Sequence, residues 1–595
     1  MVSYTAPLDD IRFDLFELWG YDDTVATLPG YEEATRDMVD AVLDAAARFC
    51  ENELLPLNGP GDVQGCVFEN GVVRTPEGFK QAYDAFVENG WTGLACDPEY
   101  GGQGLPQTLQ FVFEELICST NLSFGTYPGL SHGTYNAIAL HGSDEQKRRY
   151  LPKLVDGSWS GTMCLTEPQC GTDLGLIRTR AEPDGKGAWR ITGTKIFISA
   201  GEHDLTENIV HLVLARLPDA PPGIRGISLF LVPKFVVKED GALGARNGVA
   251  CGAIEHKMGI KASSTCVMNF DDAEGSLIGA PHKGMRCMFT MMNTARLAVG
   301  IQGLGLAETA YQSAVAYARE RLQGRALNGA KYPDQAADPI IVHPDVRKNL
   351  LTMRAYNEGA RALAVWIGMA LDIARRHPEP ERRAEADDLV ALMTPMIKAF
   401  FTDYGFEATN LGVQVFGGHG YIREHGMEQL VRDARIAQLY EGANGIQGLD
   451  LVGRKMGQGY GRLLRRFFHP VSAFIEEASG DAGMQEFVLP LAKAFAKLQQ
   501  ATLWIAQESL RDREQAGAAA SDYLRLFALV ALAYVWARTV RVALANANGD
   551  NGAFYEAKIA TARFYMTRLL PQTSALFTAI MAGAGPLMAV KEEWF

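Results

Sequence analysis

The stretch "QVFGGHGYIREHGMEQLVRDARIAQLYEG" runs from Gln414 to Gly442 and carries the most information about the fold. Its Gly-Gly pair, Gly417 and Gly418, stands where a helix would end, because glycine readily adopts the conformation of a helix C-terminus. The local pattern therefore predicts a helix, a turn and a second helix. The residues around Glu441 favour a helix-start anion stabilised by the amide dipoles of the next helix. A carboxylate that contacts a ligand is the alternative, because the neighbouring glycines let the backbone approach closely.

The composition of the whole chain limits the classes of function. A length of 595 residues is enough for two to four domains, each with its own core. A net charge of -14 argues against general attraction to nucleic acid or to anionic membranes. The nine cysteines show no paired spacing, which predicts reduced thiols in a cytoplasmic protein and implies no metal site.

Two segments bear on targeting. The N-terminus "MVSYTAPLDDIRF" lacks a basic region followed by an apolar run, so we expect no secretory signal. The apolar run "LFALVALAYVWA", residues 526–537, is bounded by Arg525 and Arg538 and is shorter than the roughly 20 residues that span a bilayer. It predicts a buried helix and no integral membrane association.

The periodicity changes twice along the chain. The first 160 residues are mostly helical, and the helix that begins near Thr35 is expected to stop before Pro56. Between Trp189 and Pro233 short β-rich runs appear, "WRITGTKIFIS", "NIVHLVLARL" and "GISLFLVPK", and helical spacing returns from Met288. The charged stretch 375–388 is expected to connect two helices. The predicted class is α+β, mainly α, with four domains: 1–160 helical, 161–283 β, 284–463 a helical bundle, and 464–595 an appended all-α domain.

Few of the short sequence motifs that mark known catalytic or nucleotide-binding sites occur in this chain. We find no Walker-type loop, no HExxH and no GxGxxG after a strand. The stretch "GLSHG", Gly129 to Gly133, has the spacing of a hydrolase nucleophile elbow with Ser131 as nucleophile. That motif needs a buried strand before it, and the preceding residues do not favour one. Ser131 and His132 are therefore interpreted as loop or packing residues, with a serine hydrolase as the remote alternative.

A second motif-bearing loop leads to a family resemblance. "MCLTEPQCGTDLG", residues 163–175, clusters hydroxyl groups and glycines just ahead of the β region, where they could surround a polar ligand. With "KIFIS", an Arg-bearing helix, "QVFGG" and the final "YEG" in the same order, the chain resembles the acyl-CoA dehydrogenase superfamily over about residues 30–460. The appended helical block is similar to the large bacterial subgroup that includes 3-methylmercaptopropionyl-CoA dehydrogenase.

The resemblance implies the acyl-CoA dehydrogenase fold, an FAD cofactor and an obligatory homo-oligomer, a dimer above all. It implies that Arg321 and the 414–418 segment reach FAD of the neighbouring subunit, and that Ser199 keeps a hydroxyl where many members have Thr. Many members have Trp in place of Phe197, so the shape of the pocket differs there. The implied FAD contacts are Met163, Leu165, Thr166, Gly171, Thr172, Phe197, Ile198, Ser199, Arg321, Gln414, Val415, Phe416, Gly417, Gly418, Ala443 and Asn444. The implied acyl-CoA contacts are Thr172, Asn293, Arg296 and Gly442.

By the same resemblance Glu441 is the catalytic base, which removes the proton alpha to the thioester carbonyl. Some relatives carry the base immediately before the Arg of the Arg-bearing helix, but that position here is Ala295. The expected product is a trans-2-enoyl-CoA, made from 3-methylmercaptopropionyl-CoA or from a medium- or long-chain acyl-CoA, with electrons passing to an electron-transfer flavoprotein. An acyl-CoA oxidase that reduces oxygen and a DNA-binding alkylation-response flavoprotein remain alternatives. Arg462, Arg465 and Arg466 form a local basic face, which is interpreted as a solvated or interface helix.

Overall fold

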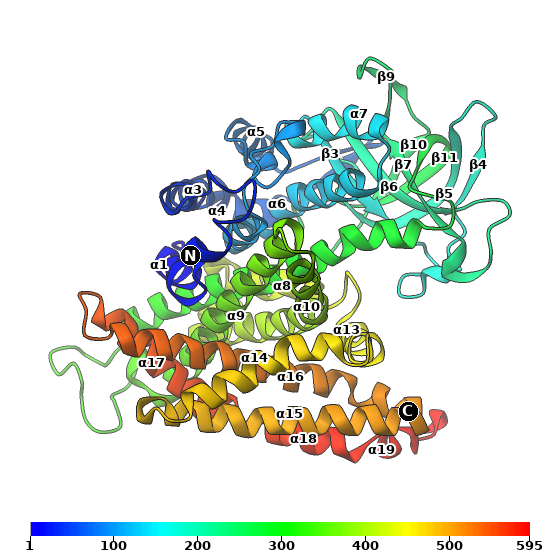
Figure 1. The fold of residues 1–595 in the computed structure, drawn as a ribbon. Coiled ribbons are helices and arrows are strands. Elements are labelled where there is room, and N and C mark those ends of the chain that lie inside the picture. Colours follow the sequence, from blue (N-terminus) through cyan, green and yellow to red (C-terminus); the bar gives the residue numbers. More distant parts are fainter. Residues whose placement is uncertain (1) are drawn as a thin grey trace. The chain divides into compact units, whose positions relative to one another are not determined.

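The computed structural model (Figure 1) describes residues 2–595. These residues form two compact units. The helical unit comprises residues 2–47, 106–119 and 299–595, and the sheet unit comprises residues 48–105 and 120–298. Each unit is thus assembled from segments that are far apart in the sequence. The division into four domains stays a prediction.

Most strands of the sheet unit form one seven-stranded sheet within residues 2–595. Strand β11 pairs antiparallel with β5 and, through its last three residues, with β7, so β11, β5, β4, β6 and β7 form a closed circuit. Strand β10 adds to β11, and β3 runs parallel to β6. The sheet's strands are β3 (Trp159–Cys164), β4 (Arg180–Pro183), β5 (Trp189–Ser199), β6 (Asn208–Arg216), β7 (Ile227–Pro233), β10 (Val249–Ile254) and β11 (Thr265–Ile278), beside the pairs β1 (Val67–Glu69) with β2 (Val72–Arg74) and β8 (Phe235–Val237) with β9 (Leu243–Arg246).

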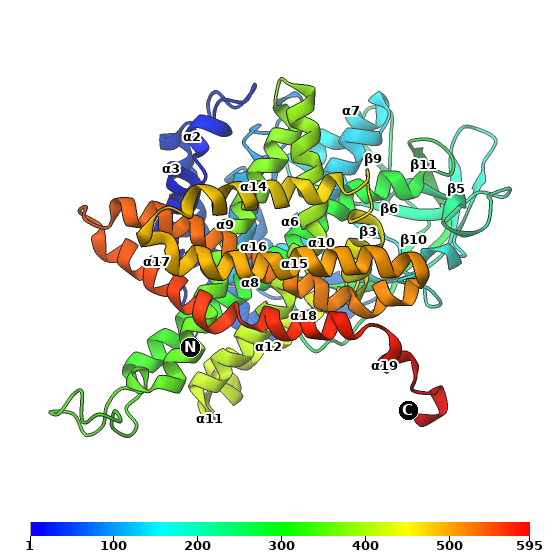
Figure 2. The same cartoon turned by 60° about the horizontal axis from the view of Figure 1, so that its bottom comes forward.

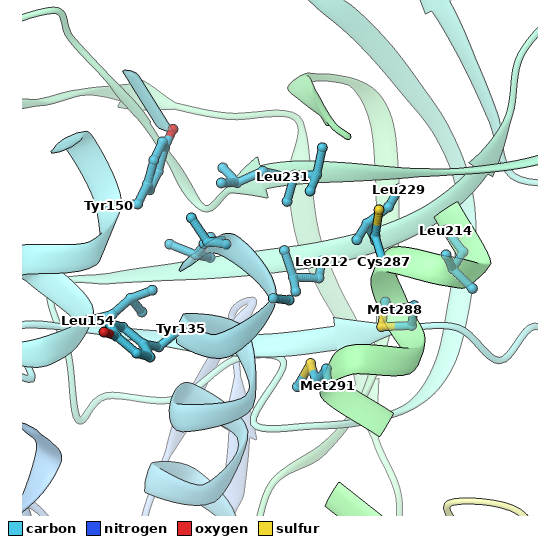
Figure 3. Close-up of a cluster of buried hydrophobic side chains, with 14 of the residues drawn as sticks. Tyr135, Tyr150, Leu154, Leu212, Leu214, Leu229, Leu231, Cys287, Met288 and Met291 are labelled. Carbon is cyan, nitrogen blue, oxygen red and sulfur yellow. The ribbon is translucent and has the colours of Figure 1, made fainter. Parts of the chain in front are cut away.

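Alternation along β6 and β7 divides the sheet unit into two cores. Leu212 and Leu214 of β6 pack with Leu229 and Leu231 of β7 against side chains from the flanking helices (Figure 3). The residues between them, such as Val213, face the other cluster, inside the strand circuit. Both faces of these strands are buried, which explains why they are continuous apolar runs. The helices of this unit are α4 (Leu55–Gln64), α5 (Phe79–Glu88), α7 (Asp144–Val155) and the parts of α6 (Gln107–His141) and α8 (Gly284–Glu320) that belong to it.

The helical unit contains long antiparallel helices that pack side by side. Its α15, α16 and α18 lie along one another in both views (Figures 1 and 2). Its interior holds the buried guanidinium of Arg361, which pairs with Glu115 at 2.7 Å and Glu308 at 3.0 Å, as a buried charge requires. Its helices are α1 (Leu8–Arg12), α2 (Tyr21–Thr24), α3 (Arg36–Phe49), α9 (Pro344–Arg376), α10 (Pro380–Phe416), α11 (Gly418–Tyr421), α12 (Met427–Arg435), α13 (Asn444–Asp450), α14 (Arg462–Ala478), α15 (Gln485–Arg511), α16 (Arg513–Asn546), α17 (Gly552–Phe564), α18 (Gln572–Ala582) and α19 (Gly585–Met588).

Three expectations about helices have clear outcomes. The run at 526–537 is buried inside α16, as predicted, although this helix is long and apolar enough by composition to cross a membrane. Pro56 does not end the helical region, because it occupies the first turn of α4, where a missing amide hydrogen costs nothing. The stretch 375–388 does join two helices, but the connection itself is short and α10 already begins at Pro380.

Candidate functional site

The residues implied by the family pattern fall into two groups, one in each unit. The sheet unit holds Met163, Leu165, Thr166, Gly171, Thr172, Phe197, Ile198, Ser199, Asn293 and Arg296. The helical unit holds Arg321, the 414–418 segment and residues 441–444.

In the sheet unit, a buried ion pair fixes the loop that follows β3. Lys195 of β5 donates to the carboxylate of Glu167 at 2.8 Å and to the carbonyl oxygen of Leu165 at 3.0 Å. The amide of Ile196 donates to the carbonyl oxygen of Thr166 at 2.9 Å, so the loop is tied to β5 at adjacent points. Burial by itself raises the pKa of Glu167, but the charge of Lys195 and several hydrogen bonds lower it to about 2. Neither member of this pair was predicted from the sequence, although both flank predicted residues.

Phe197, whose ring is predicted to contact FAD, lies in a bulge at the end of β5. Lys195 pairs with Met268 of β11 and Ile198 with Cys266, so two β5 residues oppose one β11 residue between these pairs. Phe197 lies in this bulge with a φ of 58°, and the residue is 60% exposed. Ser199 is held through its carbonyl oxygen, which accepts from the hydroxyl of Thr162 at 2.6 Å. Bulges commonly turn a side chain out of the sheet beside functional sites.

The Arg-bearing helix is the N-terminal part of α8. Asn293 is exposed, whereas Arg296 is buried with its guanidinium 5.8 Å from the centre of the Phe289 ring. Ala295 is half-buried between them. The sequence expectation that an Arg here offers directed hydrogen-bond donors remains a prediction.

In the helical unit, Glu441 stands in a strained turn between α12 and α13. Its φ is 55° and that of Gly442 is 84°, so two consecutive residues have the left-handed conformation. For a residue other than glycine this conformation costs of order 1–3 kcal/mol and persists only where the surroundings enforce it. The buried side chain of Gln447 donates to the carbonyl oxygens of Glu441 at 3.1 Å and Gly442 at 3.0 Å. Gln447 was not predicted from the sequence.

The residues on both sides of this turn are also held. Asn444, the first residue of α13, accepts from the buried amine of Lys398 at 2.7 Å and donates to the carboxylate of Asp403 at 2.6 Å, both on α10. Burial raises the pKa of Tyr440, whose hydroxyl stays protonated and donates to the side-chain oxygen of Gln302. Glu441 is half-buried, and its side chain therefore extends from a backbone that is anchored before and after it.

Arg321 and the Gly-Gly segment form a separate group at the far end of α10. Tyr317, one turn before Arg321, stacks on Phe416 with ring centres 4.2 Å apart. Gly417 ends α10 with a φ of 61°, so the predicted helix end is confirmed. Gln414 and Arg321 are exposed. Gln414 follows Asp403 by eleven residues in α10, about 17 Å along the helix axis, so this group is separated from the Glu441 turn.

Ser131 does not occupy a nucleophile elbow. It lies within α6, and its buried hydroxyl donates to the carbonyl oxygen of Tyr127 and accepts from the amide of Gly161, both at 3.1 Å. A nucleophile elbow needs a strand before the serine and an exposed hydroxyl. The interpretation of Ser131 as a packing residue is supported, but its place is in a helix and not in a loop.

Sequence models of known families match nearly the whole chain. The model described as the acyl-CoA dehydrogenase N-terminal domain matches residues 37–158, the middle domain matches 162–273, and the C-terminal domain matches 282–456. A model described as acetyl-CoA dehydrogenase C-terminal like matches residues 467–591. The appended helical block is thus similar to a known domain.

Individual relatives agree with these matches. The 3-methylmercaptopropionyl-CoA dehydrogenase of Ruegeria pomeroyi is 45% identical, over 96% of this chain and 97% of its own. The broad-specificity linear acyl-CoA dehydrogenase FadE5 of Mycobacterium tuberculosis is 32% identical over the full length of both chains. The crystal structure of an acyl-CoA dehydrogenase complexed with FAD from Bacillus anthracis shares the fold, with a TM-score of 0.72, 21% identity and coverage of 99% of this chain and 93% of that one.

Proposed function

Because this chain belongs to the acyl-CoA dehydrogenase family, we propose that it oxidises the bond between the alpha and beta carbons of an acyl-CoA thioester with FAD as cofactor. The product is the trans-2-enoyl-CoA. The proposed substrate is 3-methylmercaptopropionyl-CoA, supported by 45% identity to the Ruegeria pomeroyi enzyme over nearly the full length of both chains. A medium- or long-chain acyl-CoA is the second candidate, supported by the full-length match to the broad-specificity linear acyl-CoA dehydrogenase.

The sheet unit has groups suited to FAD. The exposed ring of Phe197 offers an apolar contact for a planar ligand, and Ser199 and Thr166 offer hydroxyl groups. These residues would hold the cofactor together with Met163 and Thr172. When bound, FAD would supply the acceptor for the hydride that leaves the beta carbon of the substrate. The Lys195–Glu167 pair keeps the loop and β5 in register, so these groups stay preorganised.

Glu441 is the proposed base, and its anchored left-handed turn is the observation that carries the proposal. Its carboxylate takes the proton from the alpha carbon, and Gln447 holds the turn while the proton moves. Ala295 has no group that accepts a proton, so the alternative base position of the family is not available. Amide groups near Glu441 can stabilise the charge that develops on the thioester oxygen.

A homodimer is part of this proposal. The group of Arg321 and residues 414–418 is remote from the Glu441 turn along α10, which supports a role toward FAD of a neighbouring subunit. A stable monomer that binds FAD fully and is active would contradict this part of the proposal.

The test compares Glu441→Gln with Ser131→Ala. The glutamine keeps the shape of the side chain but cannot take a proton, so flavin bleaching under anaerobic conditions should slow by about 10² to 10⁴ while FAD remains bound. Ser131→Ala removes a buried hydroxyl that bonds only to the backbone of Tyr127 and Gly161 and has no role in the proposed chemistry, so it should bleach at nearly the wild-type rate. Wild-type bleaching in Glu441→Gln would refute the assignment. A panel containing 3-methylmercaptopropionyl-CoA and linear acyl-CoAs tests the substrate, and peroxide formation against reduction of electron-transfer flavoprotein tests the acceptor.

A further inference from the structure

The helical unit contains a cavity of about 740 Å³ that takes no part in the proposed chemistry. It is lined by the N-terminal segment 19–28, the end of α9, the start of α10, the start of α14, and Arg538 of α16. None of its lining residues belongs to the predicted FAD or acyl-CoA contacts. Its volume is that of a small-molecule site.

The wall of the cavity includes segments on both sides of the three domains that the family shares. Residues 19–28 precede the matched N-terminal domain, which begins at residue 37, and Arg465 and Arg466 follow the matched C-terminal domain, which ends at residue 456. The three shared domains alone therefore do not form its wall. The appended block, which contributes none of the predicted flavin contacts, contributes cations here.

Positive charge is concentrated on the cavity wall. Arg382, Arg465, Arg466 and Arg538 line it against the two carboxylates Asp23 and Glu385, an excess of two positive charges in a chain whose net charge is -14. His377 and His469 also line it, and both are additional hydrogen-bonding groups. Arg465 and Arg466 belong to the basic face of α14, for which the sequence predicted a solvated or interface helix.

Two of these guanidinium groups have no carboxylate partner in the described part of the chain. Arg465 donates only to the backbone oxygen of Tyr460, at 3.3 Å, and is exposed. Arg538 donates to the hydroxyl of Tyr534 at 3.2 Å and packs 4.4 Å from the ring of Trp19. In contrast, Glu385 accepts from Arg466 at 2.8 Å and lies 3.9 Å from Arg382. A ligand anion would thus find two guanidinium groups that no carboxylate neutralises.

The remaining wall is apolar. Leu28, Met369, Ala370 and Leu389 are buried and line the cavity. The ring of Trp19 is covered on one side by Trp366, stacked at 5.0 Å, and contacts Arg538, so its stacking capacity is already used within the protein. The wall therefore suits an aliphatic group more than a further aromatic ring.

We propose that this cavity binds a small amphipathic anion, with an aliphatic chain against the apolar wall and a carboxylate or phosphate group on Arg465 and Arg538. Guanidinium groups bind either head group through directed, charge-assisted hydrogen bonds. Glu385 competes with the ligand for Arg382 and Arg466, so this carboxylate limits the affinity.

The test measures binding to the FAD-loaded full-length protein by isothermal titration calorimetry. The probes are decanoate and decyl phosphate, which share the chain and differ in the anionic group, and decan-1-ol, which lacks the charge. The variants are Arg465→Gln, which removes an exposed cation, and Glu385→Gln, which removes the competing carboxylate. Arg511→Gln is the matched control, because Arg511 is an exposed arginine of the same unit that pairs with Glu508 and does not line the cavity.

Opposite effects of the two variants are expected. Arg465→Gln should weaken binding of the anionic probe by about fivefold, and Glu385→Gln should strengthen it by a similar factor. Arg511→Gln should leave it unchanged, and higher ionic strength should weaken it. Binding of either anion in this pattern supports the proposal and identifies the preferred head group. The proposal would be overturned if neither anion binds or if decan-1-ol binds equally well. It would also be overturned if Arg465→Gln and Glu385→Gln leave the affinity unchanged, because the probe would then bind outside this cavity.

Discussion

Replacing Lys195 with methionine tests whether the buried pair with Glu167 holds the loop that follows β3. Both side chains are at most 3% exposed, and Glu167 receives further hydrogen bonds from Thr179 and from the amide of Arg178. The pKa of Glu167 is about 2, against an ordinary value of 4.5. A difference of 2.5 units at about 1.36 kcal/mol per unit corresponds to about 3 kcal/mol of stabilisation of the Glu167 carboxylate at neutral pH, from Lys195 together with the hydrogen bonds of Thr179 and Arg178. Burial lowers the pKa of Lys195, so the pair as a whole stabilises the fold by less than this. Methionine keeps most of the volume but leaves the carboxylate buried without its cation.

Hydrogen exchange is the suitable assay, because a protein of this size need not unfold in a single step. Removing one partner of a buried pair costs at least about 3 kcal/mol, so exchange of protected amides in the 165–179 region should speed up by about 100-fold or more. Lys80→Met, which removes an exposed partner of Asp84 in the same unit, should change exchange by less than about fivefold. The double variant Lys195→Met/Glu167→Gln should exchange more slowly than the single one, because it buries no unpaired charge.

The pH dependence of the same pair has a definite sign. Because folding lowers the pKa of Glu167, its contribution is fully present above the pKa of the unfolded chain, about 4.5. It should be lost as the pH falls from about 5 toward 2. In Lys195→Met the pKa of Glu167 rises, so the loss should begin at a higher pH. Exchange in Lys195→Met within a few-fold of wild type, or an unchanged acid profile, would refute the role of this pair.

Two other substitutions follow from the helical unit. Gln447→Leu removes the hydrogen-bond donors to the carbonyl oxygens of Glu441 and Gly442. We expect kcat, measured by steady-state turnover, to fall by about tenfold, and the FAD content, measured by flavin absorbance, to stay unchanged. An unchanged kcat would contradict the anchoring role of Gln447. Lys558→Met removes the buried amine that contacts the half-buried Asp10 at 2.5 Å and the buried Glu358 at 2.9 Å. It should cost about 3–5 kcal/mol, seen as a lower thermal midpoint, whereas the exposed Lys591→Met should have little effect. Equal midpoints would exclude a stabilising role for the buried amine.

The sequence by itself identified most elements whose signal is local. The runs beginning at Trp189, Asn208 and Ile227 are strands, because β-branched and apolar residues in short runs report a buried sheet. Gly417 ends α10 as its sequence indicates, and the family pattern singled out Glu441 because its motifs are short and contiguous. The sequence was less informative at Pro56, where the first turn of a helix tolerates proline, and at Ser131, where a spacing motif occurs inside α6.

Only the tertiary structure decided which residues that are distant in the sequence contact one another. Lys195 and Glu167 are 28 positions apart, and their pairing depends on how β5 meets the loop after β3. Gln447 lies in α13, and only the folded turn shows that its side chain donates to the carbonyl oxygens of Glu441 and Gly442. The cavity brings Trp19 together with Arg465 and Arg538, so no local pattern encodes it. Burial and pairing of charges are properties of the packed chain, because they depend on which side chains exclude water from one another, and residue spacing along the sequence does not record that.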